Sequence, residues 1–272
     1  FGGFQEIFTM INNADLAFPE IEVNGEKIKL SHGMYSVCMD SKDRKVRETA
    51  FKAFYKAFRD VLNTITATYA GNVNKDVFLT KARKYNSCLE RALENEDVPA
   101  EVYKNLLKYV NGALPTLHKY VKDRKETLGY DELHMYDMYV SLVEDAELKL
   151  PYEEAFKLVK KGLAPLGEDY GNLLQKAHDE GWIDVEETEG KRSGAYSVGV
   201  YGIEHPYVLL NYQPTTHDVF TIAHELGHSM HSYKSDAAQP KSKADYKIFV
   251  AEVASTVNEV LLLKYLLKNS TD

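Results

Sequence analysis

The residues with the clearest chemical potential form a five-residue segment, His224-Glu225-Leu226-Gly227-His228. Its histidines are four residues apart, so on an α-helix both imidazoles project from one face and can bind one metal ion. Zinc accepts neutral imidazole nitrogens, and a catalytic zinc site keeps one position open for water. Glu225 can take a proton from that water as it attacks a carbonyl. The alternative is a helix with two exposed histidines and a solvated glutamate, because so short a motif also arises by chance.

The residues around this motif predict a helix that is buried on one side. Thr215 and Asp218 are spaced as in a capping box, which places a helix start at Thr216. Apolar side chains recur at helical spacing through the segment, at Phe220, Ile222, Ala223, Leu226 and Met230. Buried histidine and glutamate side chains need partners, and a metal ion is the simplest common one.

A third ligand is predicted in the next helical segment, residues 244–268. Glu252 and Glu259 lie seven residues apart there, and so share one face of a largely apolar helix. A carboxylate in such surroundings is uncommon unless it is paired or binds a metal. We interpret Glu252 as the ligand and Glu259 as an acceptor for an imidazole N–H. The alternative for each is a glutamate that faces solvent.

Other histidines and the cysteines give weaker signals. His231 follows His228 by three residues and either lines a substrate cleft or makes a structural hydrogen bond. His205 and His217 flank a strand-rich segment, and we favour a role outside substrate binding for both; the alternative for each is contact with substrate. Cys38 and Cys88 lack metal-ligand spacing, so we expect both to be small buried residues.

The elements that must carry these residues are mostly helical. Helical spacing is found over residues 1–13, 43–92 (with a break at Gly71-Asn72), 97–127 (capped by Asp97), 152–163, 167–180, 216–234 and 244–268. Alternation around an Asn-Gly pair predicts a β-hairpin over residues 21–28. Short strands are predicted at residues 183–185, 195–201 and 207–212. The fold class is therefore mainly α, with a small β region just before the helix of the motif.

Composition restricts the partners and the compartment. The chain has 272 residues, 44% of them hydrophobic, and a formal net charge of −8. That charge argues against a nucleic-acid partner and against anchoring to a membrane by basic residues. A membrane-spanning helix needs about 20 consecutive apolar residues, and none is present. Two cysteines make no disulfide framework, which favours the reducing cytoplasm.

Longer motifs make the sequence resemble one family. The segments 224–232 and 248–259 are similar to the oligoendopeptidase F branch of the thimet-oligopeptidase-like (M3) zinc metallopeptidases, as are Leu133–Tyr139, Arg192–Tyr196 and Pro206–Tyr212. The resemblance implies a zincin-like helical fold with two lobes around a channel. It also implies one Zn²⁺ per chain, held by His224, His228 and Glu252, with Glu225 as general base.

The same resemblance implies how substrate binds. Residues 207–212 would form an edge strand beside the cleft that pairs with an extended peptide. The candidate substrate-binding residues are Tyr207, Leu209, Asn211 and His231. The implied activity is hydrolysis of internal bonds in short oligopeptides through a zinc-bound water. The sequence carries no signal for an oligomeric state.

The extent of the resemblance also predicts how the chain is organised. We expect residues 1–75 to be part of an N-terminal helical region with the β-hairpin, and residues 76–272 to be the zinc-peptidase catalytic region. Members of the family continue for hundreds of residues further, and that part is implied to supply a histidine and tyrosines that stabilise the oxyanion. The alternative function is therefore a fragment that binds zinc and peptide without turnover, since losing an oxyanion donor costs about 10²–10³ in rate.

Overall fold

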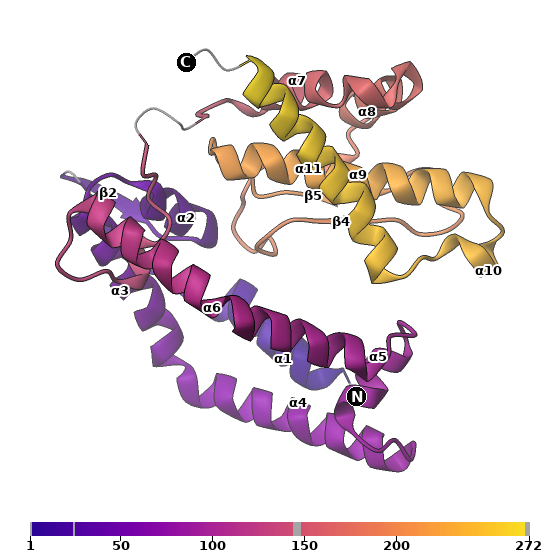
Figure 1. Ribbon diagram of the computed structural model, residues 1–272, viewed down its shortest axis with the longest axis horizontal. Coiled ribbons are helices and arrows are strands. Elements are labelled where there is room, and N and C mark those ends of the chain that lie inside the picture. The colour runs from indigo at the N-terminus through magenta and orange to yellow at the C-terminus, as the bar shows by residue number, and fades with distance from the viewer. Residues whose placement is uncertain (1, 24, 144–147, 270–272) are drawn as a thin grey trace. The chain divides into compact units, whose positions relative to one another are not determined.

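The structure, a computed structural model, describes residues 2–23, 25–143 and 148–269 (Figure 1). The chain forms two compact units, unit 1 over residues 1–144 and unit 2 over residues 145–272. Both are mainly helical with small sheets, so the predicted fold class is confirmed. The predicted boundary at residue 75 falls inside a helix, Leu62–Ala82, and that division into regions stays a prediction.

Unit 1 contains a hairpin and a series of helices. Its elements are α1 (Gly3–Met10), the π-helical turn η1 (Ile11–Asp15), β1 (Glu20–Val23), β2 (Glu26–Lys29), α2 (His32–Asp40), α3 (Arg44–Asp60), α4 (Leu62–Ala82), α5 (Cys88–Glu94), α6 (Ala100–Leu128) and the 3-10 turn η2 (Met135–Asp137). The predicted hairpin is confirmed, with Glu20 opposite Lys29 and Val23 opposite Glu26. Its core joins the hairpin to α2 and α3 through residues such as Leu30, Met39 and Phe54.

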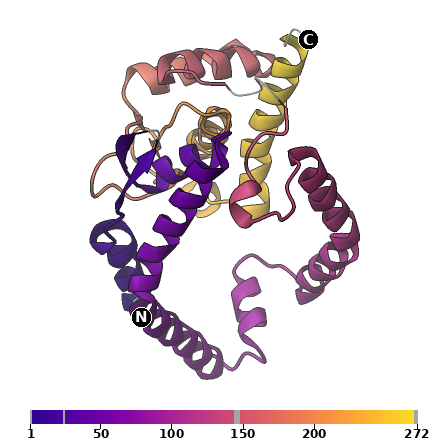
Figure 2. The ribbon, with the colours of Figure 1, turned by 90° about the vertical axis from the view of Figure 1, so that its left-hand side faces the viewer.

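The predicted break at Gly71-Asn72 is wrong. The long helical segment is interrupted at Val61 instead, and Gly71 lies inside α4. A Cβ atom at Gly71 would lie 2.2 Å from the Phe4 ring. The glycine therefore allows α1 to pack closely against α4, an arrangement visible in Figures 1 and 2. Close packing against Phe4, rather than a break in the helix, therefore explains why a glycine occupies position 71.

Two smaller predictions for unit 1 are also wrong. Asp97 does not cap α6, because Pro99 occupies the N-cap position and Asp97 adopts a left-handed backbone with φ of 54°. Cys88 is exposed at the start of α5, whereas Cys38 is buried as expected. A side chain at the first position of a seven-residue surface helix has little core to enter.

A buried ion-pair network fixes η2 against α3 and α6, and we call it the Asp137 cluster (Arg44, Arg47, Arg124 and Asp137). The Asp137 carboxylate accepts hydrogen bonds from Arg47 at 2.8 Å and from Arg44 at 2.9 and 3.1 Å. Arg124 donates to the backbone carbonyl of Asp137 at 3.0 Å. The side chains of Arg47 and Asp137 are both fully buried.

Unit 2 carries the motif helix. Its elements are α7 (Tyr152–Gly162), the 3-10 turn η3 (Ala164–Leu166), α8 (Glu168–Asp179), β3 (Ile183–Asp184), β4 (Tyr196–Val198), β5 (Tyr207–Leu209), α9 (Thr216–Ala238), α10 (Lys241–Ala244) and α11 (Ile248–Asn269). The core gathers α7, α8, the sheet and α9 around Trp182, which is 1% exposed. Helix α11 crosses α9 (Figures 1 and 2).

The small sheet has the order β3-β5-β4. Strand β5 is parallel to β3 and antiparallel to β4, and the amides of Val208 and Leu210 donate to carbonyls of Trp182 and Asp184. The predicted edge strand over residues 207–212 is therefore wrong, because β5 is the middle strand and both of its sides are paired. Strand β4, an outer strand of this sheet, packs on α9.

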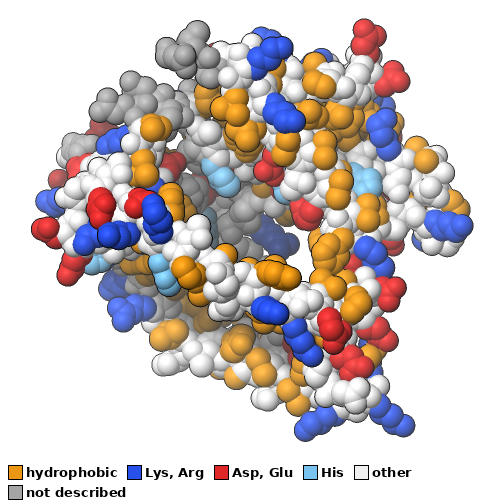
Figure 3. All heavy atoms as spheres, in the orientation of Figure 1, with side chains coloured by type: hydrophobic (Ala, Val, Ile, Leu, Met, Phe, Trp, Pro, Cys, Tyr) orange, Lys and Arg blue, Asp and Glu red, His pale blue; other side chains and the backbone are white. Residues whose placement is uncertain are grey.

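Helix α11 has a long exposed apolar surface. Phe249, Val253 and Leu267 are each more than half exposed, and Figure 3 shows hydrophobic side chains gathered on the surface over this helix. None of the described helices is long and apolar enough to span a membrane.

Candidate metal centre

Helix α9 begins at the predicted position. The Thr215 hydroxyl accepts a hydrogen bond from the Asp218 amide at 3.2 Å, which satisfies one of the unpaired amides of the first turn. The Asp218 carboxylate accepts from the Thr215 hydroxyl at 2.8 Å. Val219, Ile222 and Leu226 on the buried side of α9 enter the core of unit 2. The opposite side of the helix carries the two histidines of the motif.

A glycine brings α11 close to these histidines. A Cβ atom at Gly227 would lie 2.7 Å from the Cα of Ser255 and 2.8 Å from the carbonyl oxygen of Ala254. The two helix backbones therefore touch at a crossing that only glycine on α9 allows. Glu252 lies three residues before Ser255 on α11, so the crossing places its side chain within reach of α9.

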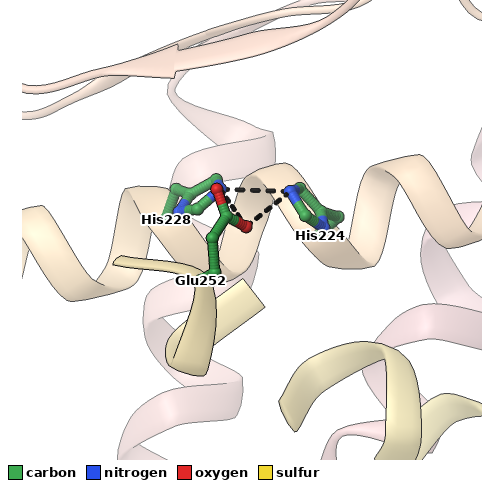
Figure 4. Close-up of side chains that lie close together, drawn as sticks. All are labelled: His224, His228 and Glu252. Atoms are coloured by element: carbon green, nitrogen blue, oxygen red, sulfur yellow. Dashed lines mark hydrogen bonds and ion pairs between the residues drawn. The ribbon is translucent and has the colours of Figure 1, made fainter. Parts of the chain in front are cut away.

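Three predicted ligands converge at this crossing (Figure 4). The Nε2 atoms of His224 and His228 lie 3.1 Å apart. The Glu252 Oε2 lies 3.5 Å from His224 Nε2 and 3.6 Å from His228 Nε2. Metal–ligand distances of about 2.0–2.2 Å in tetrahedral geometry correspond to donor separations of about 3.3–3.6 Å. The three donor atoms thus have the chemistry of a metal site, with two separations in this range and the distance between the two imidazole nitrogens slightly shorter.

The other ring nitrogens are held by hydrogen bonds. His224 Nδ1 lies 2.5 Å from Glu259 Oε1, and the His228 ring makes a hydrogen bond with the backbone of Ala251. A proton held on Nδ1 by Glu259 leaves the Nε2 of His224 with a lone pair for a metal. The Ser255 hydroxyl donates to Glu252 Oε2 at 2.9 Å and helps to orient that carboxylate. The side chain of Glu252 is nonetheless 48% exposed.

Glu225 lies beside the ligands in a drier environment. It is 7% exposed, and burial raises its pKa above the usual value for a glutamate. His224 lowers the pKa, the charge of Glu252 raises it, and a hydrogen bond from the Ser197 backbone lowers it. Burial also lowers the pKa of His228, and the neighbouring His224 lowers it further, which favours the neutral imidazole that metals bind.

A cavity of about 250 Å³ adjoins the ligands on the N-terminal side of the motif. It is lined by His217, Phe220, Thr221, His224, Glu225 and Glu259. His217, for which the sequence favours a role outside substrate binding, thus lies beside the candidate base. His205 does pack structurally, since its ring stacks on Trp182 at 4.6 Å.

The predicted substrate-binding residues lie at different places in unit 2. Tyr207 is 53% exposed on β5, and Leu209 follows it on the same strand. The Asn211 amide donates to the carbonyls of Arg192 and Gly194, so it holds a loop in place. The His231 ring stacks on Tyr246 at 3.8 Å. Substrate binding by these four residues stays a prediction.

No sequence motif predicts several contacts of the site. Ser197 and Ala251 form hydrogen bonds with Glu225 and His228 through their backbones, and any residue type could supply such a bond. Ser255 offers a weak signal, because it follows Glu252 by three residues and so shares its face of α11. Asn258 anchors α11 by donating to the Ala223 carbonyl at 2.9 Å. As a polar residue directly before Glu259 in a largely apolar helix, it could have been selected from the sequence as a contact residue.

Comparison with known proteins decides the family. Residues 37–272 match Peptidase family M3. The chain belongs to peptidase family M3. Oligopeptidase PepF of Bacillus subtilis (strain 168) is 46% identical over 272 residues, which are 100% of this chain and 40% of PepF. Group B oligopeptidase PepB of Streptococcus agalactiae is 41% identical over 100% of this chain and 45% of its own length.

Solved structures agree with this M3 assignment. Oligoendopeptidase-F from Enterococcus faecium is 34% identical, with a TM-score of 0.61, over 99% of this chain and 41% of that chain. PZ peptidase A, at 20% identity, shows the fold alone, with a TM-score of 0.84 over 97% of this chain and 46% of that one. The resemblance to oligoendopeptidase F is confirmed. The chain spans less than half the length of these M3 relatives.

Proposed function

We propose that this chain carries the zinc site of an endopeptidase that hydrolyses internal bonds of short oligopeptides. The convergence of His224, His228 and Glu252 donor atoms at 3.1–3.6 Å is the observation that carries this proposal. Membership of peptidase family M3 and similarity to proteins named oligopeptidases support the reaction and the substrate class.

His224, His228 and Glu252 would hold one Zn²⁺. When bound there, zinc supplies a Lewis acid that lowers the pKa of water and polarises a carbonyl. Glu259 fixes the protonated nitrogen of His224, so that Nε2 faces the ligand position. Ser255 restrains the Glu252 carboxylate in the same way.

Glu225 is the proposed general base. It lies next to His224 and is largely buried, so its raised pKa matches a group that accepts a proton from water and later donates it to the leaving amine. The hydrogen bond from the Ser197 backbone restrains the Glu225 carboxylate and opposes part of the rise in its pKa that burial causes.

An extended peptide would bind along β4 rather than β5. Both sides of β5 are paired, whereas β4 directs the Ser197 backbone to Glu225, so its outer side faces the base. Main-chain pairing on this side would present the scissile bond near Glu225. Strand β4 would then separate the peptide backbone from Tyr207 and Leu209 on β5, so binding on β4 argues against direct main-chain pairing of the peptide with these residues.

The cytoplasm is the proposed compartment. Cys38 and Cys88 are both free, which suits a reducing environment. The net charge of −8 supports peptides rather than nucleic acid as partners.

Metal content per chain tests the proposal first. We expect about one zinc ion per chain in protein purified without added metal or chelator, and almost none in His228→Ala. His178→Ala is the matched control, because this histidine pairs with Glu153 on α7 and lies outside the ligand set. Zinc at the same level in all three proteins would contradict the site. Zinc in the wild type without hydrolysis of any internally quenched peptide would favour the alternative, a chain that binds metal and peptide without turnover.

A further inference from the structure

The segment between α9 and α11 folds back along α9. It runs over residues 239–247 and is held by three side chains that follow the motif on α9. The Ser235 hydroxyl donates to the Ala244 carbonyl at 2.7 Å. The Ser232 hydroxyl lies 2.6 Å from the Tyr246 hydroxyl, and the His231 ring stacks on the Tyr246 ring at 3.8 Å and 14°. Tyr246 is thus held by a ring stack and by a hydrogen bond to its hydroxyl.

The helix that follows Tyr246 has little burial at its start. Ile248 and Phe249, the first two residues of α11, are 52% and 62% exposed. The amides of Val250 and Ala251 donate to the Lys247 carbonyl, so only Lys247 separates Tyr246 from the first helical residue, Ile248. Hydrophobic burial therefore contributes little to the position of this first turn. Tyr246 anchors the turn before Glu252, and the crossing at Ser255 anchors the turn after it.

We propose that Tyr246 is a positioning residue for the metal site. Held by His231 and Ser232, it fixes the first turn of α11 and so keeps the Glu252 carboxylate against His224 and His228. Helix α9 then positions all three ligands. It carries His224 and His228 itself, and it positions Glu252 through the contacts of His231 and Ser232 with Tyr246. The inference rests on the proposed zinc site and assigns new roles to Tyr246, His231 and Ser232.

Zinc affinity of the full chain, measured by competition with a chromophoric chelator, tests this role without using activity. We expect Tyr246→Ala to weaken zinc binding about 10–100-fold, the usual loss when support of a ligand is removed. Tyr246→Phe keeps the ring stack and loses one hydrogen bond, so the expected loss is about 5-fold. Tyr265→Ala is the matched control, because this half-buried tyrosine lies on the same helix beyond the site. An unchanged affinity in Tyr246→Ala would overturn the proposal.

A double-mutant cycle separates positioning from general destabilisation. If Tyr246 acts through Glu252, Tyr246→Ala should change affinity less than about 2-fold in a Glu252→Ala background. An equal loss in both backgrounds would show that Tyr246 acts on the whole unit, and would overturn the proposal. Should Tyr246→Ala fail to fold by circular dichroism, Ser232→Ala replaces it in the same cycle, with the smaller loss expected of Tyr246→Phe.

The same data distinguish this inference from the proposed function. A wild type that binds no zinc, or a Glu252→Ala variant with wild-type affinity, overturns the zinc site and this role with it. Zinc binding that depends on Glu252 but not on Tyr246 leaves the site intact and removes only the positioning role.

Discussion

The two units each bring charged and polar side chains together, and they do so with opposite results. In the Asp137 cluster of unit 1, one carboxylate accepts from two arginines and from the His134 backbone amide. Burial raises the pKa of Asp137, but these hydrogen bonds outweigh burial and lower it to about 2. In unit 2, the donor atoms of His224, His228 and Glu252 face one another, and burial raises the pKa of Glu225.

This difference separates a structural cluster from a candidate catalytic one. The Asp137 cluster matches acceptors with donors and opposite charges, so its polar groups satisfy one another. The ligands of unit 2 present lone pairs toward a common point, an arrangement that suits a cation. Substitutions in unit 1 should therefore change stability, and substitutions in unit 2 should change metal binding and turnover.

The largest expected effect is on catalysis. Glu225→Gln should lower hydrolysis of an internally quenched peptide about 10²–10⁴-fold, because the amide cannot accept the proton of the attacking water. Zinc content and the thermal unfolding midpoint should stay near wild type. Glu186→Gln, which alters an exposed glutamate of the same unit, is the control. Full activity in Glu225→Gln would remove Glu225 from the reaction.

The next effect is on the stability of unit 1. Asp137→Asn leaves the buried Arg47 without its counter-charge, so the free energy of unfolding should fall by about 3–5 kcal/mol. Urea unfolding followed by circular dichroism measures the change. The control, Asp60→Asn, removes an exposed partner of Lys56 and should leave the midpoint unchanged. Equal effects of the two substitutions would contradict the distinction drawn for the Asp137 cluster.

A smaller effect is expected at the support of a ligand. Glu259→Ala removes the acceptor for His224 Nδ1, and zinc affinity should fall about 10–100-fold. Glu259→Gln keeps a hydrogen-bond acceptor, so its zinc affinity should lie between the affinities of Glu259→Ala and the wild type. Chelator competition gives both values, and an unchanged affinity in Glu259→Ala would mean that this carboxylate does not orient the ligand.

The smallest effect is the acid dependence of unit 1. Asp137 has a lower pKa in the folded chain than its ordinary 3.8, so its contribution to stability is present above about pH 4 and is lost as pH falls through about 2. Urea midpoints measured between pH 5 and pH 2 should fall across this window, and Asp137→Asn should flatten that part of the curve. A variant with the same slope as the wild type would assign the acid sensitivity to other carboxylates.

The sequence predicted which side chains come together better than it predicted the packing around them. His224, His228 and Glu252 do converge, because spacing along one helix and one carboxylate in an apolar helix are local signals, whereas their roles stay predictions. The middle position of β5 depends on which strands pair with it on each side, at residues 183–184 and 196–198, and alternation within one strand does not identify its partners. Gly71 was predicted to break a helix because a glycine can do so, whereas its contact with Phe4 is visible only in three dimensions. The sequence shows that α11 is largely apolar, but not which of its apolar residues are covered, and Phe249 and Val253 are exposed.

The crossing at Gly227 also bears on how the two clusters form as the chain folds. His224 and Glu259 are 35 residues apart, whereas Arg47 and Asp137 are 90 apart. Closing the longer loop costs about 0.8 kcal/mol more in chain entropy. The metal site therefore has low contact order, and α9 and α11 can come together early as a helical hairpin. Any metal ion that the completed hairpin binds would stabilise the folded state by mass action.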